Sequence, residues 1–247
     1  MGMAAQSRPT VILTRPAEAS ARFAAQLRAR FGDVAVLISP LMAPVLLTPP
    51  LPAHWDGVIF TSETGVAGLA RLTAQRGPAV CVGPRTAQAA QAQGWEAEPL
   101  GGDAERLLAA LVARGTQGHW LHARGRDSAG DLAQRLDAAG WQVTPLLVYA
   151  QEEQHLTSEA RLVLERAAPV VVAVFSPRSA AIFAAQAGRV AAPLQVAAIS
   201  PAAAAPMQAL APGRVELART PDAPGMLDAL GRILGKDGGA QAAQVYR

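Results

Sequence analysis

The sequence contains two copies of one pattern, and this internal repeat restricts the fold more than any other feature. The segment GVIFTSETGVAGLA at residues 57–70 returns as VAVFSPRSAAIFAA at 172–185, and AVCVGPRTAQAAQAQG at 79–94 returns as VAAISPAAAAPMQALA at 196–211. The copies are offset by roughly 110–120 residues, which is too long for a solenoid repeat. Two related copies predict two lobes of similar fold, and a cleft between lobes is a common ligand site.

Each copy repeats a short apolar strand, a turn of small or polar residues, and an amphipathic helix. The strand VILT at 11–14 precedes a helix expected over 17–30, where Phe23, Leu27 and Phe31 have the spacing of a buried stripe. Strands that alternate with helices in this way predict an α/β fold with parallel, doubly wound sheets. Further helices are expected over residues 64–75, 85–93, 128–139, 158–167, 178–187, 201–210 and 223–234.

The composition is that of a globular protein and excludes several functional classes. Of the 247 residues, 51% are hydrophobic and 17% are charged, and the formal net charge is +3. This weak, scattered positive charge suits an acidic small molecule and argues against a nucleic-acid partner. No apolar run is long enough to span a membrane, and the first residues carry no signal-peptide core. With a single cysteine, Cys81, we expect a cytoplasmic protein without disulfides or membrane contact.

The turns that follow the strands carry the candidate binding groups. In doubly wound sheets, ligands bind outside the carboxyl ends of the strands, where these turns converge. Helix N-termini there offer unpaired N–H groups, so that nearby hydroxyl groups and Arg side chains can help to hold carboxylates or phosphates. Each Ser or Thr taken alone is also explained as a helix cap. The candidates are Arg15, Thr61, Ser62, Thr86, Arg124, Ser176, Arg178 and Ser200.

The motifs of P-loop proteins, Rossmann proteins and serine hydrolases are absent from the sequence. His119 and His122 lie on one expected strand but point to opposite faces, so they cannot share a metal ion, and no metal site is expected. Tyr149 lies in LLVYA (146–150), which ends the strand where the chain is expected to cross between lobes, so the phenol can face the cleft. With no His or Lys among the turn groups, this phenol is the best available proton donor. Equally, a buried Tyr often only packs, with its hydroxyl satisfied.

Several strings, in their order and spacing, resemble the uroporphyrinogen-III synthase family of tetrapyrrole biosynthesis over about residues 10–235. They are LTRP (13–16), DGVIFTSETGV (56–66), VGPRTA (82–87), LLVYA (146–150), FSPRSA (175–180) and AAISP (197–201). The resemblance implies a HemD-like fold: two flavodoxin-like lobes with parallel sheets, joined by a two-stranded linker, with the cleft between them. It also implies that residues 1–40 and 153–247 form one lobe and that 41–152 form a second lobe inserted into the first.

The resemblance further implies an activity. Family members close linear hydroxymethylbilane with loss of water and inversion of ring D, through an azafulvene cation and a spiro intermediate. They work without a metal or organic cofactor and generally as monomers. Tyr149 would protonate the leaving hydroxyl, and Ser62, Thr86 and Ser176 would face the cleft.

One departure from the family pattern is the run Ala202–Ala205, where the family often carries a Thr. We expect main-chain N–H groups near Ala202 to hold a carboxylate there in place of a hydroxyl. The alternative function is a non-catalytic two-lobed binding protein for a polyanionic metabolite, which the alanine run mildly favours.

Overall fold

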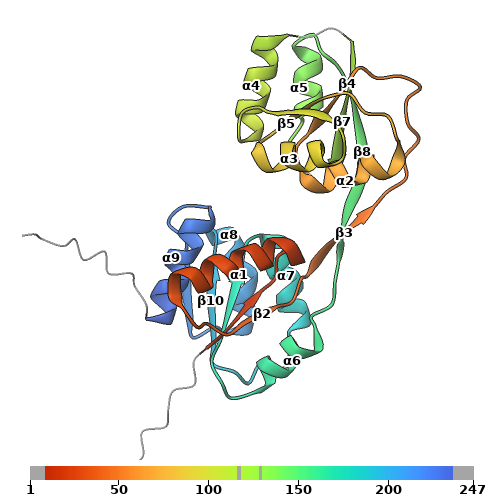
Figure 1. The fold of residues 1–247 in the computed structure, drawn as a ribbon. Coiled ribbons are helices and arrows are strands. Elements are labelled where there is room, and N and C mark those ends of the chain that lie inside the picture. Colours follow the sequence, from red (N-terminus) through yellow and green to blue (C-terminus); the bar gives the residue numbers. More distant parts are fainter. Residues whose placement is uncertain (1–8, 116–117, 128–129, 236–247) are drawn as a thin grey trace, which may run out of the picture. The chain divides into compact units, whose positions relative to one another are not determined.

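The chain forms two α/β units (Figure 1). The structure, a computed structural model, describes residues 9–115, 118–127 and 130–235. Unit 1 is made of the two ends of the chain, Met1–Ala43 and Glu153–Arg247, and unit 2 of the segment between them, Pro44–Glu152. Each unit contains one largely parallel sheet with helices packed on it, which confirms the α/β fold class with two parallel-sheet lobes. No helix of the described residues is both long and apolar enough to cross a membrane.

Unit 1 is built on a five-stranded sheet in which all neighbouring strands run parallel. Its middle strand β9 is valine-rich and completely buried, as a parallel strand covered on both faces requires. In spatial order the strands are β11 (Arg214–Leu217), β10 (Leu194–Ala198), β9 (Val170–Val174), β1 (Thr10–Leu13) and β2 (Val36–Ile38).

Helices cover both faces of this sheet and divide the core of unit 1 into two clusters. On one face, α1 and α9 pack against Val11 and Val171; on the other, α6 and α7 pack against Ile12 and Val172. The expected stripe of α1 lies buried in the first cluster. The helices are α1 (Ala17–Phe31), α6 (Ser158–Glu165), α7 (Pro177–Gln186), α8 (Pro201–Ala204), the 3₁₀ helix η1 (Ala205–Leu210) and α9 (Ala223–Leu234).

Unit 2 is built on a six-stranded sheet whose edge strand β3 runs antiparallel to β8. The N–H of Leu47 donates to the carbonyl of Val148, and the N–H of Gln154 donates to the carbonyl of Leu41. The residue numbers therefore decrease along one strand as they increase along the other, as in an antiparallel pair. The other pairs are parallel. In spatial order the strands are β3 (Met42–Leu46), β8 (Gln142–Glu153), β7 (His119–Gly125), β4 (Gly57–Phe60), β5 (Pro78–Cys81) and β6 (Glu96–Pro99).

Two helices cover each face of this second sheet, and α2 (Glu63–Leu72) lies very close to it. The pairs are α2 with α3 (Pro84–Ala92), and α4 (Ala104–Arg114) with α5 (Leu132–Ala138). A Cβ on Gly65 would lie 2.7 Å from the carbonyl oxygen of Ala123, and one on Gly68 would lie 2.8 Å from the side chain of Val148. These glycines therefore let the first turns of α2 approach β7 and β8.

Each sheet combines strands from both copies of the repeat. In unit 1, β1 of the first copy pairs with β9 of the second, Thr10 lying opposite Val170. In unit 2, β7 of the second copy pairs with β4 of the first, Gly57 lying opposite Trp120. The copies therefore exchange their opening strand–helix–strand segments, and five strands of each sheet follow the same order.

Three expected helices differ from those observed. The helix expected over 64–75 ends at Leu72. The helix expected over 128–139 spans Leu132–Ala138, and residues 128–129 lie outside the described part of the chain. The helix expected over 201–210 is α-helical only as far as Ala204 and continues as a 3₁₀ helix. Pro206 accounts for this change, because it has no N–H to continue the α-helical hydrogen bonds.

Candidate functional site

Three of the candidate serines cap helices. The hydroxyl oxygens of Ser62, Ser176 and Ser200 each accept a hydrogen bond from the N–H three residues later, at 3.0, 3.1 and 3.2 Å. They are the N-caps of α2, α7 and α8. A cap of this kind stabilises a helix by about 1 kcal/mol. All three serines are therefore explained as helix caps, and any role in binding a ligand would be additional to capping.

Ser62 has a second partner, the phenol of Tyr149. The two hydroxyl oxygens lie 3.2 Å apart, and either group can donate to the other. Tyr149 lies on β8, is 9% exposed and packs in the core beneath α2, whereas Ser62 is half-buried at the start of that helix. The ring is thus packed as a core side chain, while its hydroxyl meets the first turn of α2. The sequence placed both residues among the candidates but did not predict their contact.

Gly125 makes room for the Tyr149 ring. The register of β7 against β8 shifts between Arg124 and Gly125, which leaves Gly125 opposite Tyr149. A Cβ on Gly125 would lie 2.6 Å from two ring carbons of Tyr149 and 2.9 Å from its hydroxyl oxygen. The N–H of Arg126 donates to the carbonyl of Tyr149 at 2.8 Å and holds the backbone there. The ring therefore occupies space that any other side chain at position 125 would fill.

Thr61 contacts His122, which sequence reasoning left outside the turn groups. The Nε2 atom of His122 lies 3.3 Å from the Oγ1 atom of Thr61. His122 is opposite Ile59 in the β4–β7 ladder, on the sheet face covered by α4 and α5. The turn groups themselves contain no histidine, but His122, within β7, contacts one of them. The available signal was the alternation along β7, which puts His122 on the same face as Arg124.

His122 is held in its neutral form. Its side chain is 3% exposed, and this burial, helped by the nearby charge of Arg124, lowers the pKa of the imidazole to about 4. The ring therefore carries a single proton at neutral pH, on one nitrogen or the other.

The two other candidates of unit 2 are less accessible or are bound to main chain. Thr86 lies within α3 and is 6% exposed. The guanidinium group of Arg124 donates to the carbonyl oxygens of Gly125 at 3.4 Å and Gly130 at 3.3 Å. Arg124 is therefore held at the carboxyl end of β7, two residues beyond His122.

In unit 1, Arg15 is the candidate with a defined side-chain contact to a ring. Its guanidinium carbon lies 4.6 Å from the ring centre of Phe175, a cation–π distance, and Phe175 packs edge-on against Phe23. Arg178 is exposed on α7. These residues follow β1 and β9, neighbouring strands whose carboxyl ends lie at one edge of the sheet.

The alanine run begins in a short helix, and the N–H groups of two of its alanines are already engaged. Ala202 is exposed in the four-residue helix α8. The N–H of Ala203 lies within bonding distance of the hydroxyl and the carbonyl of Ser200, and the N–H of Ala204 donates to that carbonyl. These two N–H groups therefore serve the turn itself, which weakens the expectation that main chain there holds a carboxylate.

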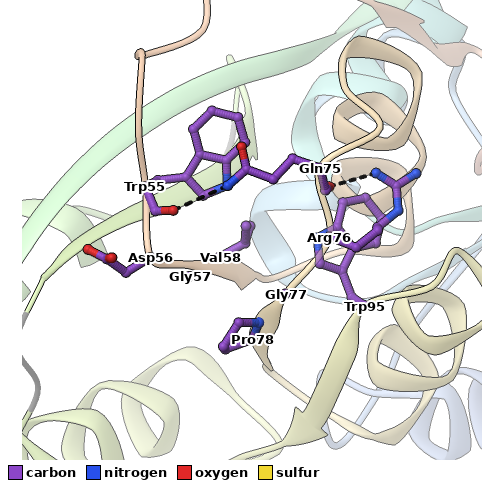
Figure 2. Close-up of a pocket in the computed structure, with 9 residues that line it drawn as sticks. All are labelled: Trp55, Asp56, Gly57, Val58, Gln75, Arg76, Gly77, Pro78 and Trp95. Atoms are coloured by element: carbon purple, nitrogen blue, oxygen red, sulfur yellow. Dashed lines mark hydrogen bonds between the residues drawn. The ribbon is translucent and has the colours of Figure 1, made fainter.

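A pocket of about 50 Å³ opens where β4 and β5 of unit 2 begin, at the opposite end of these strands from the turn groups (Figure 2). Arg76 lies 4.1 Å over the ring of Trp95 and donates to main-chain carbonyls, and the amide of Gln75 donates to the carbonyl of Trp55. A pocket of this size admits only a few water molecules. Within the described residues, no three His, Cys, Asp or Glu side chains are grouped to hold a metal ion.

The fold and these groups define a class: an α/β protein of two units with doubly wound sheets, whose hydroxyl and guanidinium groups gather where parallel strands end. The family model for uroporphyrinogen-III synthase HemD matches residues 16–228. The chain therefore belongs to the uroporphyrinogen-III synthase HemD family, as the sequence motifs predicted.

Solved structures with a similar fold carry the same description. The uroporphyrinogen-III synthetase of Helicobacter pylori superposes with a TM-score of 0.59 at 15% identity, covering 91% of this chain and 99% of that one. A mutant uroporphyrinogen III synthase from Thermus thermophilus gives a TM-score of 0.47 at 18% identity, covering 92% and 99%. A comparison with curated protein sequences gives no significant match. The first of these similarities confirms the HemD-like fold.

Proposed function

We propose that the protein is a uroporphyrinogen-III synthase, a hydro-lyase that converts linear hydroxymethylbilane into uroporphyrinogen III with loss of water and inversion of ring D. The observation that carries the proposal is the family match over residues 16–228. The contact between Ser62 and Tyr149 supports it, because a hydroxyl leaves as water only when a proton donor reaches it.

In this proposal, Tyr149 is the source of the proton for the leaving hydroxyl. Its ring is buried, but its O–H lies 3.2 Å from the hydroxyl of the half-buried Ser62. The phenol gives this proton to the leaving hydroxyl of a substrate held at the start of α2, and Ser62 lies beside it as a binding group. Gly125 leaves the space that the phenol occupies at that distance, so Gly125 acts as a positioning residue.

The other candidates are proposed to bind the substrate, which bears eight carboxylates. Loss of water leaves an azafulvene cation that attacks a substituted pyrrole position, and the spiro intermediate then fragments and recloses. The protein's task is to hold the chain in the pose that reaches this route, and positioning of that kind can supply about 7 kcal/mol or more. The proposed binding residues are Arg15, Thr61, Ser62, Thr86, Arg124, Ser176, Arg178, Ser200 and Ala202.

The remaining expectations belong to the same proposal. The enzyme is proposed to act without a metal or organic cofactor, as a cytoplasmic monomer, on a substrate held by both lobes. The lobes are residues 1–40 with 153–247, and residues 41–152.

The test is to generate hydroxymethylbilane enzymatically, add the protein, oxidise the product and separate the uroporphyrin isomers by chromatography. Product enriched in isomer III over the protein-free control is the expected result, and an isomer ratio equal to that control would refute the proposal. A protein that binds an octacarboxylate porphyrin yet leaves the ratio unchanged would be the non-catalytic binding protein.

The role of Tyr149 has a matched control, because the chain contains only two tyrosines and Tyr246 lies outside the described residues. Tyr149→Phe should lower kcat at unchanged KM in a protein that still folds, with about 1 kcal/mol of stability lost with the hydrogen bond to Ser62, whereas Tyr246→Phe should leave kcat, KM and stability unchanged. A Tyr149→Phe variant with full turnover would remove the phenol from the mechanism.

A further inference from the structure

The two nitrogen atoms of His122 have different surroundings. Nε2 lies 3.3 Å from the Oγ1 atom of Thr61, whereas Nδ1 is buried and has no hydrogen-bond partner among the described residues. The ring is 3% exposed, so solvent does not supply that partner. A neutral imidazole places its single proton on one of these nitrogens, and the other is an acceptor.

The unpartnered Nδ1 decides where the proton resides. Both tautomers keep a hydrogen bond between Nε2 and Thr61, so they differ in what is left unsatisfied at Nδ1. A buried N–H without an acceptor is rarer in proteins than an acceptor with an unused lone pair. This difference favours the tautomer with the proton on Nε2, in which His122 donates to the Oγ1 atom of Thr61.

This direction determines what Thr61 offers to a ligand. A hydroxyl group has one proton and two lone pairs. Because Oγ1 accepts from His122, its own proton is left to donate elsewhere, and Thr61 is only half-buried at the end of β4. With the opposite tautomer, Thr61 would donate to His122 and present lone pairs, which repel a carboxylate.

We propose that His122 is a positioning residue that directs the Thr61 hydroxyl outward as a hydrogen-bond donor for a carboxylate of the substrate. The inference rests on the proposed function, since it assigns a role within the same set of turn groups. The charge of Arg124, two residues along β7 on the same face, favours an anion there. The low pKa of His122, about 4, keeps the ring neutral at the pH of an assay.

The tautomer is tested first, without substrate. Long-range ¹H–¹⁵N spectra of the ¹⁵N-labelled protein at neutral pH distinguish the two neutral forms and the charged form of each histidine. The chain has four histidines, and the signals of His122 are those that disappear in the His122→Gln variant. The expected form is neutral with the proton on Nε2. A proton on Nδ1, or a charged ring, would overturn the inference whatever the activity of the protein.

The binding role is tested by separating KM from kcat for hydroxymethylbilane. A hydrogen bond to a carboxylate is worth enough that Thr61→Val should raise KM roughly tenfold or more. His122→Leu should raise KM by a similar factor, the double variant should be no worse than either single one, and kcat should hold in all three. His122→Gln, whose amide N–H can reach Thr61, should recover most of the loss. Its recovery is measurable even if His122→Leu does not fold.

The same strand carries a matched control at its other end. The Nε2 atom of His119 lies 2.7 Å from the hydroxyl of Thr144, a second His–Thr pair that lies where β7 and β8 begin. Thr144→Val should therefore leave KM unchanged. If the wild type makes isomer III but Thr61→Val has the KM of wild type, the inference fails and the function stands.

If the wild type makes no isomer III, the function fails. The effect of Thr61→Val is then measured on binding of uroporphyrin, an octacarboxylate, by quenching of tryptophan fluorescence. Unchanged binding in Thr61→Val would overturn the inference in that case as well, and weaker binding would support it.

Discussion

Replacing Gly125 with Ala should lower turnover by displacing the phenol of Tyr149. The added Cβ would lie 2.6 Å from the Cε2 and Cζ atoms of the ring. Carbon atoms in contact are separated by about 3.5–4.0 Å, so the ring must move by about 1 Å. A displacement of this size can reduce a rate by about 10²-fold, which equals about 2.7 kcal/mol of activation free energy. Overpacking of this kind should also destabilise the protein by about 1–3 kcal/mol.

The assay measures kcat, KM and the isomer ratio at a temperature well below the unfolding transition of the variant. Gly77→Ala is the matched control in the same unit, because a Cβ there meets no heavy atom within 4 Å. Gly125→Ala should lower kcat with little effect on KM, and should add little to the loss in a Tyr149→Phe background. Wild-type kcat in the folded Gly125→Ala variant, or a full additional loss in the Phe background, would refute the positioning argument.

Three further changes follow from the contacts described. Ser62→Ala removes the cap of α2 and should lower the free energy of unfolding in urea by about 1 kcal/mol; an unaltered unfolding midpoint would count against the cap. This variant should lose less turnover than Tyr149→Phe, because neighbouring N–H groups remain. His122 binds a proton near pH 6.5 in the unfolded chain but near pH 4 in the folded protein, so acidification through this range should remove up to about 3 kcal/mol of stability. Urea unfolding at pH 7 and 4.5 measures this loss, which the His122→Gln variant should lack. Burial raises the pKa of Cys81 to about 12, so its thiol should react with an aromatic disulfide reagent only after denaturation, and rapid reaction of the native protein would contradict this burial.

The fold was largely predictable because its central elements are strongly apolar and periodic. The helix expected over 17–30 is observed as Ala17–Phe31, and the buried stripe of this helix is the reason for the agreement. The strand expected to begin at Trp95 is the edge strand β6, which is not apolar as expected, since it reads Glu-Ala-Glu-Pro and only Ala97 is buried. An edge strand has one pairing partner and partial cover, so its residues need not show the apolar run that marks β9.

The candidate site was predictable as a set of turn residues but not as a set of contacts. Ser62 and Tyr149 are 87 positions apart, and they meet only because of the register shift at Gly125 and the close approach of α2. Neither cause has a local signal in the sequence. His122 was missed for another reason: it was weighed as a metal ligand and not as a hydrogen-bond partner of a neighbouring strand.

The exchange of strands between the two copies also orders the assembly of the protein during synthesis. All strands of unit 2 lie within Pro44–Glu152 except for the start of β3 and the last residue of β8, so its sheet can close once that segment has left the ribosome. Strand β1 is made first, yet its partner β9 lies 160 positions later, at Val170 opposite Thr10. Until β9 has been made, β1 can pair only with β2, and the residues Val11–Leu13, fully buried in the native protein, lack their neighbour on the other side. We expect the earliest part of the chain to be the last to fold and the part most in need of protection by a chaperone.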